Sequence, residues 1–288
     1  MTQDLAAPSK MKSLLKKHDF HFKKSLGQNF LTDRHILEKI VQAADIGPDD
    51  FVLEVGPGAG VLTRYLAEKA KKVVAIELDR TLLPVLTESL ADFSNVEIMQ
   101  GDVLQVDLRQ IMQEGSWKVV ANLPYYITTP VIFRFLENKL PLKSLTVMVQ
   151  KEVAERMAAL PGGKDYGNLS VVVQYYSRPK IAVNVPKTVF LPQPEVDSAV
   201  INLAVYSEPV VEVKSEKDFF RVVKAAFSQR RKTLRNCLKN GLNLDKEKLE
   251  TLFRLSGIDG TRRGETLSLA DFASLANQLT KLTENNER

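Results

Sequence analysis

The alternation of short apolar segments with helical patterns between residues 51 and 157 constrains the fold most. Apolar segments typical of buried strands occur at Phe51–Val55, Val73–Glu77, Val96–Met99, Trp117–Ala121 and Leu145–Gln150. Helical patterns lie among them at Val61–Lys69, Leu82–Leu90, Val131–Leu136 and Ala154–Met157. Strands that alternate with helices predict a parallel sheet with helices on both faces. We therefore expect an α/β fold.

The residues before this alternation predict a basic segment followed by one helix. Residues 1–24 are polar and rich in lysine, so we expect a flexible segment with a short helix at Met11–Lys17. From Thr32 onward, apolar residues recur at helical spacing until Gly47-Pro48. Thr32 is a residue type that caps helix N-termini, and we expect it to cap this helix.

The last part of the chain changes character near residue 207. Asn168–Tyr176 fits either periodicity, and the preceding alternation favours a helix. Lys180–Val185 and Ser198–Val205 are predicted to be two late strands, which could pair as an antiparallel hairpin. A linker at Ser207–Val213 follows, and then helical patterns only, at Glu216–Phe227, Arg230–Asn240, Asp245–Ser256 and Leu269–Leu282. We expect three parts, namely a flexible segment at 1–24, an α/β domain at 25–206 and a small all-helical domain at 207–288.

Composition excludes several classes of protein. The single cysteine, Cys237, rules out an internal disulfide and a cysteine-rich zinc site. The three histidines do not have metal-ligand spacing with carboxylates, so we expect no metal. No stretch approaches the roughly 18 apolar residues that a membrane span needs, and no secretory signal precedes the alternation. We therefore expect a soluble cytoplasmic protein.

Charge is distributed unevenly along the chain. Residues 1–30 carry six lysines and two aspartates, and residues 208–288 carry sixteen basic and twelve acidic residues. The body between them is slightly acidic. Two basic ends favour a polyanionic partner, although ordinary solvated surface accounts for the net charge of +5 equally well.

A glycine-rich turn follows the first predicted strand, with the sequence Glu54-Val55-Gly56-Pro57-Gly58-Ala59-Gly60. Glycines at this place let the backbone approach a ligand closely. The third glycine comes one residue too early for the dinucleotide fingerprint, and Pro57 removes an N–H that a pyrophosphate could use. The turn therefore favours a nucleoside ligand without a pyrophosphate and disfavours a nicotinamide dehydrogenase, while a purely structural tight turn is the alternative.

Two carboxylates end the next two predicted strands. Glu77 follows Gly56 by 21 residues, at a position where an acid accepts hydrogen bonds from both ribose hydroxyls. Asp102 ends the third strand, where a carboxylate can accept from an adenine 6-amino group. Either acid alone could be surface charge. Both acids beside the glycine turn predict an adenosine pocket.

Further motifs carry a resemblance to a known family. The fourth strand ends in Asn122-Leu123-Pro124-Tyr125, which with the glycine turn and the two acids resembles the S-adenosylmethionine-dependent methyltransferases that act on exocyclic amines. The segments Lys24–Leu31, Phe190–Ser198 and Gly257–Ser268 are similar to those of the small-subunit ribosomal RNA adenine dimethyltransferases. The resemblance covers about Lys24 to Leu279. It implies a Rossmann-like methyltransferase domain whose parallel sheet has a late antiparallel strand, followed by a small C-terminal all-helical domain. Gly264 departs from it, because we expect Ala there.

The resemblance implies methyl transfer to adenine N6 with S-adenosylmethionine as the cofactor. The Asn122 side-chain oxygen and the Pro124 carbonyl could each accept one N6–H bond and so stabilise the charge that develops on the nitrogen. Tyr125 and Phe190 could stack on the two faces of the target base. A core aromatic is the alternative for Phe190.

Residues near the first motif would hold the methionine end of the cofactor. Gln28 and Asn29 are candidate donors, with Gly56 and Gly58 beneath, and the Leu31 region would cover the ligand. Asn122 is expected to contact the cofactor as well. Helix-entry capping is the rival interpretation for Gln28 and Asn29.

The basic ends would hold the substrate. Arg230, Arg231, Lys232 and Arg235 form a cluster, and a helix would place Arg231 and Arg235 on one face that suits phosphates. A solvated basic face is the simpler alternative. The partner that the resemblance implies is small-subunit (16S) ribosomal RNA in an immature 30S particle, with two adjacent adenines in a hairpin near its 3′ end as targets, and we expect a monomer.

Other functions stay open at this point. A non-catalytic RNA-binding assembly or transcription factor could use the same fold, although Glu77, Asp102, Asn122 and Tyr125 favour catalysis. A related enzyme of large-subunit RNA or of DNA is a third possibility. DNA adenine enzymes usually carry a Pro-Pro pair where this chain has Leu123-Pro124.

Overall fold

The computed structural model describes residues 5–23 and 26–284, which form two compact units. The first unit contains Met1–Ala154 and Arg178–Val205, and the second contains Glu155–Ser177 and Tyr206–Arg288. The sequence predicted one division, at residue 207. Residues 155–177 instead belong with the helical unit.

The reason lies in the aromatic residues of α8 (Asn168–Tyr176). Tyr175 is buried, and its ring stacks on Phe219 of the helical unit with 4.7 Å between ring centroids. The hydrophobic core of this unit therefore recruits a segment that precedes the last strands. The alternation of strands and helices predicted a helix here, which α8 confirms, but that pattern cannot identify the packing partner of the helix.

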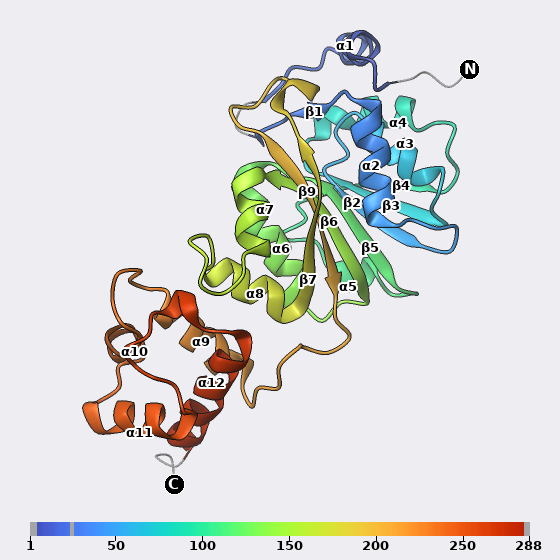
Figure 1. Cartoon of the computed structure of the whole chain (residues 1–288). Helices are drawn as coiled ribbons and strands as arrows, with labels where there is room; N and C mark the ends of the chain where they lie inside the picture. Colours follow the sequence, from blue (N-terminus) through green and yellow to red (C-terminus); the bar gives the residue numbers. More distant parts are fainter. Residues whose placement is uncertain (1–4, 24–25, 285–288) are drawn as a thin grey trace. The chain divides into compact units, whose positions relative to one another are not determined.

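The first unit is built on a mixed sheet with the strand order β4-β3-β2-β5-β6-β9-β7 (Figure 1). The strands are β2 (Phe51–Val55), β3 (Lys72–Glu77), β4 (Val96–Gln100), β5 (Trp117–Asn122), β6 (Leu142–Gln150), β7 (Ser177–Val185) and β9 (Ser198–Val205). From β4 to β6 the pairing is parallel, and β9 pairs antiparallel with β6. The predicted parallel sheet with a late antiparallel strand is confirmed.

Helices cover this sheet because its central strands are apolar on both faces. Val52 and Leu53 point to opposite faces of β2, and neither is exposed to solvent. The helices of the first unit are α1 (Pro8–Lys17), α2 (Arg34–Ala44), α3 (Val61–Ala67), α4 (Leu83–Ser89), α5 (Leu108–Ile111) and α6 (Thr128–Glu137). The helix α7 (Lys151–Ala158) runs from the first unit into the second.

The amino-terminal part differs from its prediction. The short helix predicted at Met11–Lys17 is present as α1 and begins three residues earlier, at Pro8, but its apolar face is packed against the core, with Met11 0% exposed. Met11 and its apolar neighbours one turn on join the core of the sheet unit, so the lysines occupy only the outer face. The cap of α2 was also predicted wrongly. Asp33, not Thr32, accepts a hydrogen bond from the Ile36 N–H, at 2.9 Å.

The second unit is helical, as predicted, with its own core. Besides α8 it contains α9 (Glu216–Ala226), α10 (Leu234–Leu242), α11 (Lys246–Ser256) and α12 (Leu269–Glu284). Gly264 lies where there is no room for a side chain, because a Cβ there would lie 2.6 Å from the carbonyl oxygen of Ala226. Packing therefore explains the glycine that departs from the family pattern.

Two short strands complete the first unit. β1 (Phe30–Leu31) pairs antiparallel with β8 (Phe190–Leu191). Segments 160 residues apart in sequence thus meet beside the main sheet.

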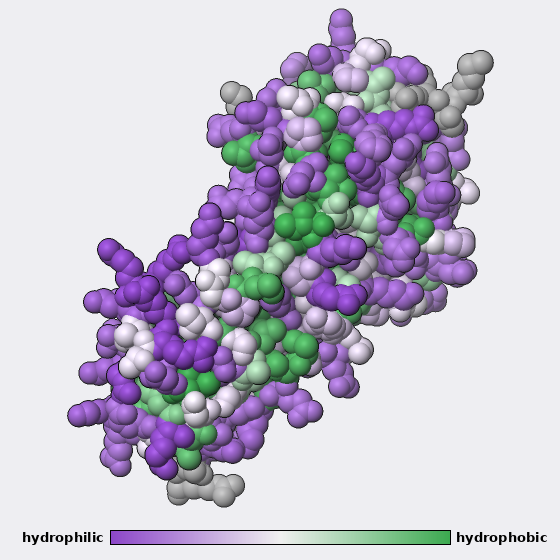
Figure 2. All heavy atoms as spheres, viewed as in Figure 1, coloured by the Kyte–Doolittle hydropathy of each residue, from purple (hydrophilic) through white to green (hydrophobic). Residues whose placement is uncertain are grey.

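Polar residues cover most of the face that Figure 2 displays. In the described residues, no helix is both long and apolar enough to cross a membrane.

Candidate active site

A cavity opens at the carboxyl ends of the parallel strands in the first unit, where the register of β2, β3 and β5 brings the glycine turn and the polar strand ends to one edge. It encloses about 830 Å³ of space, including its open mouth. The residues predicted for the cofactor and for the chemistry line it, namely Gln28, Asn29, Gly56, Gly58, Glu77, Asp102, Asn122, Pro124, Tyr125 and Phe190. Leu31 is the exception, and it lines a smaller neighbouring cavity beneath the glycine turn.

The glycine turn needs its glycines for two reasons. Gly58 has a φ of +59°, which side-chain-bearing residues rarely adopt. A Cβ on Gly58 would also lie 2.9 Å from the ring of Phe30. The turn therefore brings bare backbone to the cavity wall, which fits a ligand that approaches closely.

Glu77 is fixed at the end of β3 by the backbone around it. Its Oε2 accepts from the Gly58 N–H at 3.2 Å, and its Oε1 accepts from the Asp79 N–H at 2.8 Å. Burial raises the pKa of Glu77 above its ordinary value, and these two hydrogen bonds partly oppose the rise. A carboxylate held in this way keeps further lone pairs for hydroxyl donors of a ligand.

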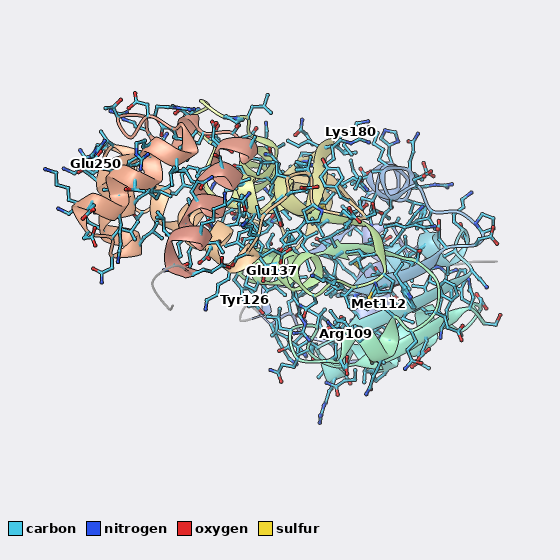
Figure 3. The ribbon with its side chains drawn as sticks, turned by 90° about the horizontal axis from the view of Figure 1, so that it is seen from below. Arg109, Met112, Tyr126, Glu137, Lys180 and Glu250 are labelled. Carbon is cyan, nitrogen blue, oxygen red and sulfur yellow. The ribbon has the colours of Figure 1, made fainter. Side chains whose placement is uncertain are left out.

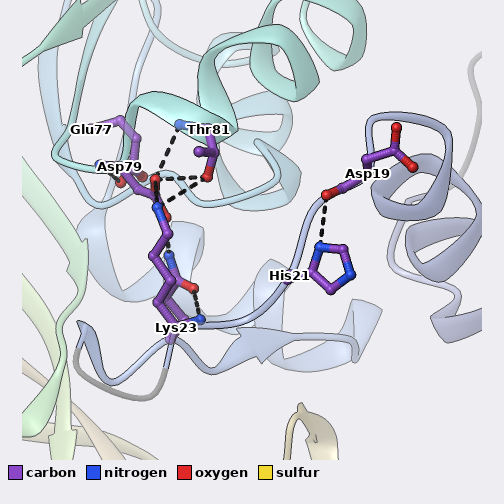
Figure 4. A network of polar contacts seen from close by, with 7 residues as sticks. Asp19, His21, Lys23, Glu77, Asp79 and Thr81 are labelled. Atoms are coloured by element: carbon purple, nitrogen blue, oxygen red, sulfur yellow. Dashed lines mark hydrogen bonds and ion pairs between the residues drawn. The ribbon is translucent and has the colours of Figure 1, made fainter.

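Asp79 joins this strand end to the amino-terminal segment (Figure 4). Its buried carboxylate accepts from Lys23 Nζ at 2.6 Å and from Gln28 Nε2 at 2.8 Å, and it also accepts from Thr81. Burial alone would raise the pKa of Asp79, but the hydrogen bonds from Lys23 and Thr81 hold it below its ordinary value. The network fixes Gln28 in the cavity wall.

Gln28 is therefore neither a helix cap nor a free donor. Both ends of its side-chain amide are engaged, because Oε1 accepts from the Lys23 N–H at 2.8 Å. Asn29 donates its side-chain Nδ2 to the Gly27 carbonyl at 3.0 Å. The remaining residues of this motif, 24 and 25, lie outside the described residues.

Asn122 is oriented by the same segment. Its Nδ2 donates to the main-chain carbonyl of Asn29 at 3.0 Å. This bond leaves Oδ1 as the group available to accept, and no described residue donates to it. The side chain thus presents an acceptor at the wall of the cavity.

The carbonyl of Pro124 is already in use. It accepts from the Ile127 N–H at 3.2 Å, in the 3-10 turn Tyr125–Ile127, and from the Thr128 hydroxyl at 3.3 Å. Both acceptor positions of this oxygen therefore have protein donors. The carbonyl of Leu123, which also lines the cavity, has no such turn donor among the described residues.

Two aromatic rings flank this part of the cavity. The Tyr125 hydroxyl is hydrogen-bonded to Ser198 at 2.9 Å, and burial, together with the charge of Asp197, raises its pKa. Phe190 is 6% exposed and belongs to the core cluster, so the core interpretation describes its packing correctly. It also lines the cavity, because β8 brings it there by pairing with β1.

Asp102, which the sequence analysis predicted to accept from an adenine amine, lines the cavity. Its Oδ1 accepts from the Leu104 N–H at 2.9 Å, and its Oδ2 accepts from the Gln105 side chain at 3.0 Å. The carboxylate is thus oriented by the turn after β4 and faces the cavity that Glu77 also lines.

Glu54 is a second, unpredicted carboxyl beside the glycine turn. It is 1% exposed, and its Oε2 has no hydrogen-bond partner among the described residues. Burial, and to a smaller degree the charge of Glu77, raises the pKa of Glu54 to about 8. The group therefore carries a proton at neutral pH.

This raised pKa makes stability depend on pH. Between the ordinary pKa of 4.5 and the folded-state pKa of about 8, the folded chain binds more protons than the unfolded chain. The free energy of unfolding therefore falls as pH rises through this window. We expect Glu54→Gln to remove this dependence, so that the difference in melting temperature between pH 6 and pH 9 is smaller in the variant. Equal changes in melting temperature between pH 6 and pH 9 in the variant and the wild type would contradict this prediction.

The predicted RNA cluster does not form one helical face. The helix α10 begins at Leu234, so Arg231 lies in the preceding turn. Arg235 forms an ion pair with Glu250 (labelled in Figure 3), and its guanidinium lies 5.1 Å from the ring centroid of Phe253. The helix was predicted to begin at Arg230, four residues too early. The run of basic residues contains no capping residue before Thr233 that would have marked the true start.

The four cationic side chains of this cluster therefore differ. Arg230 donates to the Lys164 carbonyl at 2.8 Å and lies 3.5 Å from a carboxylate oxygen of Glu265. Arg231 and Lys232 are exposed and have no ion pair within the part of the chain that the structure describes. These two are the members free to bind phosphate.

Sequence reasoning missed two residues of the site, Asp79 and Tyr126. Asp79 lies two residues after Glu77. This short distance in sequence from a strand-end carboxylate was the signal that could have identified Asp79 as part of the site. Tyr126 follows Tyr125 and lines the cavity, with 58% of its surface exposed. No periodicity distinguishes it from an ordinary surface tyrosine.

Comparisons with known proteins agree with this geometry. Residues 19–281 match the family described as ribosomal RNA adenine dimethylase. The chain is 54% identical over 280 residues to ribosomal RNA small subunit methyltransferase A of Alkaliphilus metalliredigens, covering 96% of this chain and 98% of that protein. It is 53% identical over 285 residues to the protein of the same name from Bacillus cytotoxicus, with the same coverage.

Two solved structures are similar along most of the chain. A dimethyladenosine transferase from Plasmodium falciparum is 27% identical, with a TM-score of 0.74, over 89% of this chain and 98% of that one. The 23S rRNA methyltransferase ErmE is 26% identical, with a TM-score of 0.68, over 87% of this chain and 99% of that one.

Proposed function

Because this chain belongs to the ribosomal RNA adenine dimethylase family, we propose that it dimethylates adenine N6 in small-subunit ribosomal RNA. The targets that we propose are two adjacent adenines in a hairpin near the 3′ end of the 16S RNA. The observation that carries the proposal is the orientation of Asn122, whose amide donates to Asn29 and leaves its oxygen as an acceptor in the cavity. An exocyclic amine is a donor that such an acceptor selects.

The cavity fits S-adenosylmethionine as the cofactor. The bare backbone at Gly58 admits a closely approaching ligand, and Glu77 and Asp102 offer acceptors for ribose hydroxyls and an adenine amine. Gln28 and Asn29 form the wall beside them. The cofactor would supply an activated methyl group, and the protein would position it against the amine.

The protein must make the target nitrogen more reactive, because its lone pair is delocalised into the adenine ring. Asn122 Oδ1 accepts one N6–H and aims the lone pair at the methyl group. It also stabilises the positive charge that grows on the nitrogen, so it binds the transition state better than the ground state. A main-chain carbonyl accepts the second N6–H. Leu123 can supply it freely, whereas Pro124 would have to share an oxygen that already has two donors.

The rings of Tyr125 and Phe190 hold the plane of the base. Both line the cavity, and the hydrogen bond between the hydroxyls of Tyr125 and Ser198 anchors the Tyr125 ring. Aromatic faces suit any base, so they retain the adenine outside its RNA stack without determining its identity. Selection of a base that carries an exocyclic amine then falls to the two acceptors.

The proposed partner is small-subunit ribosomal RNA in an immature 30S particle in the cytoplasm, bound by the protein as a monomer. The rival proposal is a non-catalytic RNA-binding factor on the same fold. Titrating S-adenosylmethionine into the protein by calorimetry separates the two. We expect saturable one-to-one binding, and a protein that binds RNA but takes up no cofactor would favour the rival.

We expect Arg231→Ala combined with Lys232→Ala to weaken binding to small-subunit particles and to flatten its salt dependence. These side chains are exposed and have no ion pairs in the described residues, so each can contact a phosphate. Two lost contacts reduce the slope of log K against log salt by roughly 1.4–1.8. Binding measured at several salt concentrations gives this slope.

Arg235→Ala is the matched control from the same cluster. It removes a side chain already paired with Glu250, so it should lower stability and leave the salt slope close to that of wild type. Equal slopes in the double variant and the wild type would mean that the cluster is only solvated surface.

A further inference from the structure

Tyr126 is a large aromatic side chain left open to solvent at the cavity. It is 58% exposed, and it lines the same cavity as Asn122 and Tyr125 (labelled Tyr126 in Figure 3). Its neighbour Tyr125 is anchored through its hydroxyl to Ser198. No described residue bonds to the Tyr126 hydroxyl, so polar anchoring does not account for the position of this ring.

The Tyr126 ring lies beside Gly27 on one of its sides. A Cβ on Gly27 would lie 3.5 Å from ring atom Cε1 and 3.6 Å from Cδ1. Both distances are ordinary van der Waals contacts, so Gly27 is a close neighbour of one side of the ring, and the short 3-10 turn Tyr125–Ile127 fixes the backbone that carries it. A ring that is flanked on one side and exposed on the rest is preorganised to bind a flat apolar surface.

The two adjacent tyrosines of the cavity differ in how far they are buried. Tyr125 is the half-buried member, within the polar surroundings of Ser198, and Tyr126 is the exposed member. When a base enters the cavity, the nucleotide next to it in the strand stays outside, within one backbone step. That neighbouring base has lost a stacking partner, and an exposed aromatic ring beside the cavity can replace it.

We propose that Tyr126 is a stacking platform for the nucleobase next to the target adenine. This inference rests on the proposed RNA substrate and adds a positioning residue to it. The ring binds the neighbouring base through its face, so it contributes to RNA affinity and to placement of the strand, and it leaves the cofactor untouched. Recognition is by stacking, so it does not depend on the hydroxyl.

Three variants test the proposal in the full chain with unmethylated small-subunit particles. Base–aromatic stacking makes Tyr126→Ala weaken particle binding roughly five- to 150-fold. Tyr126→Phe keeps the ring and should stay within about twofold of wild type, whereas Tyr126→Leu keeps apolar bulk and should resemble Tyr126→Ala. Leu255→Ala on α11, another exposed apolar residue, is the matched control and should behave as wild type.

The cofactor affinity of each variant, measured by calorimetry without RNA, completes the test. The proposal expects it to stay within about twofold of wild type. If Tyr126→Ala weakens cofactor binding and leaves particle binding unchanged, the ring supports the Gly27 segment instead, and the proposal is wrong. It is also wrong if Tyr126→Leu binds particles as well as wild type. Failure of the proposed function is a separate result, in which the wild-type protein itself does not methylate the particles.

Discussion

Replacing Asn122 by Ala should slow methyl transfer about 100- to 1000-fold and change cofactor affinity little. The side chain supplies an acceptor that meets the developing charge on the amine, and its orientation is fixed in advance by the bond to Asn29. Losing a preorganised partner of this kind costs roughly 2.7–4 kcal/mol of transition-state stabilisation. Single-turnover methylation of small-subunit particles at saturating cofactor isolates this step from binding.

Asn202→Ala is the matched control for this substitution. Asn202 also donates its amide to a main-chain carbonyl, that of Ala43, but it does not line the cavity. Its removal should lower stability and leave the rate at saturation unchanged. A rate for Asn122→Ala within threefold of wild type would remove the side chain from the chemistry, and the main-chain carbonyls and aromatic rings would then orient the base.

Glu77→Ala should weaken cofactor binding about ten- to 100-fold while the sheet stays folded. The carboxylate ends β3 at the cavity, and the Gly58 and Asp79 N–H groups hold it in place. Losing hydrogen bonds from a ligand to a charged group costs roughly 1.5–3 kcal/mol. Calorimetry gives the dissociation constant directly, and circular dichroism checks that the variant is folded.

Glu97→Ala on the neighbouring strand β4 is the matched control. Glu97 pairs with Lys72 on the sheet and does not line the cofactor cavity. It should leave the dissociation constant within about twofold of wild type. If a folded Glu77→Ala variant binds the cofactor as tightly as Glu97→Ala does, the ribose is not bound at the end of β3.

The sheet and the cavity could be predicted because their signals are local. Apolar strands that alternate with helices specify a parallel sheet, and such a sheet brings all carboxyl ends to one edge. Gly58, Glu77 and Asn122 therefore meet without any knowledge of long-range contacts. Gln28, Asn29 and Phe190 come from segments distant in sequence from these strand ends, and they were predicted from the family resemblance alone.

The predictions that failed depended on contacts between distant segments. The α1 helix is buried because its apolar face finds the core of the sheet unit, and its lysines alone predicted a flexible segment. Arg235 is engaged because α11 brings Glu250 beside it. In both cases the local sequence shows correctly which residues are charged. It does not show the residues from elsewhere in the chain that bury α1 or pair with Arg235.

The same limit applies to the acceptors around the target amine. The sequence identifies the Asn122–Tyr125 motif but cannot show that the Pro124 carbonyl closes a 3-10 turn. Nor does it show that Asp79 links Glu77 to the amino-terminal segment, because that link needs the folded positions of Lys23 and Gln28.

Nucleoside mass spectrometry of RNA from unmethylated small-subunit particles, treated with the full chain and S-adenosylmethionine, tests the central claim most directly. The account predicts N6,N6-dimethyladenosine at two adjacent adenines in a hairpin near the 3′ end, and its absence when the Asn122→Ala variant is used for the same short incubation. Particles that gain no dimethyladenosine with the wild-type protein, or that gain methyl groups on another base, would contradict it.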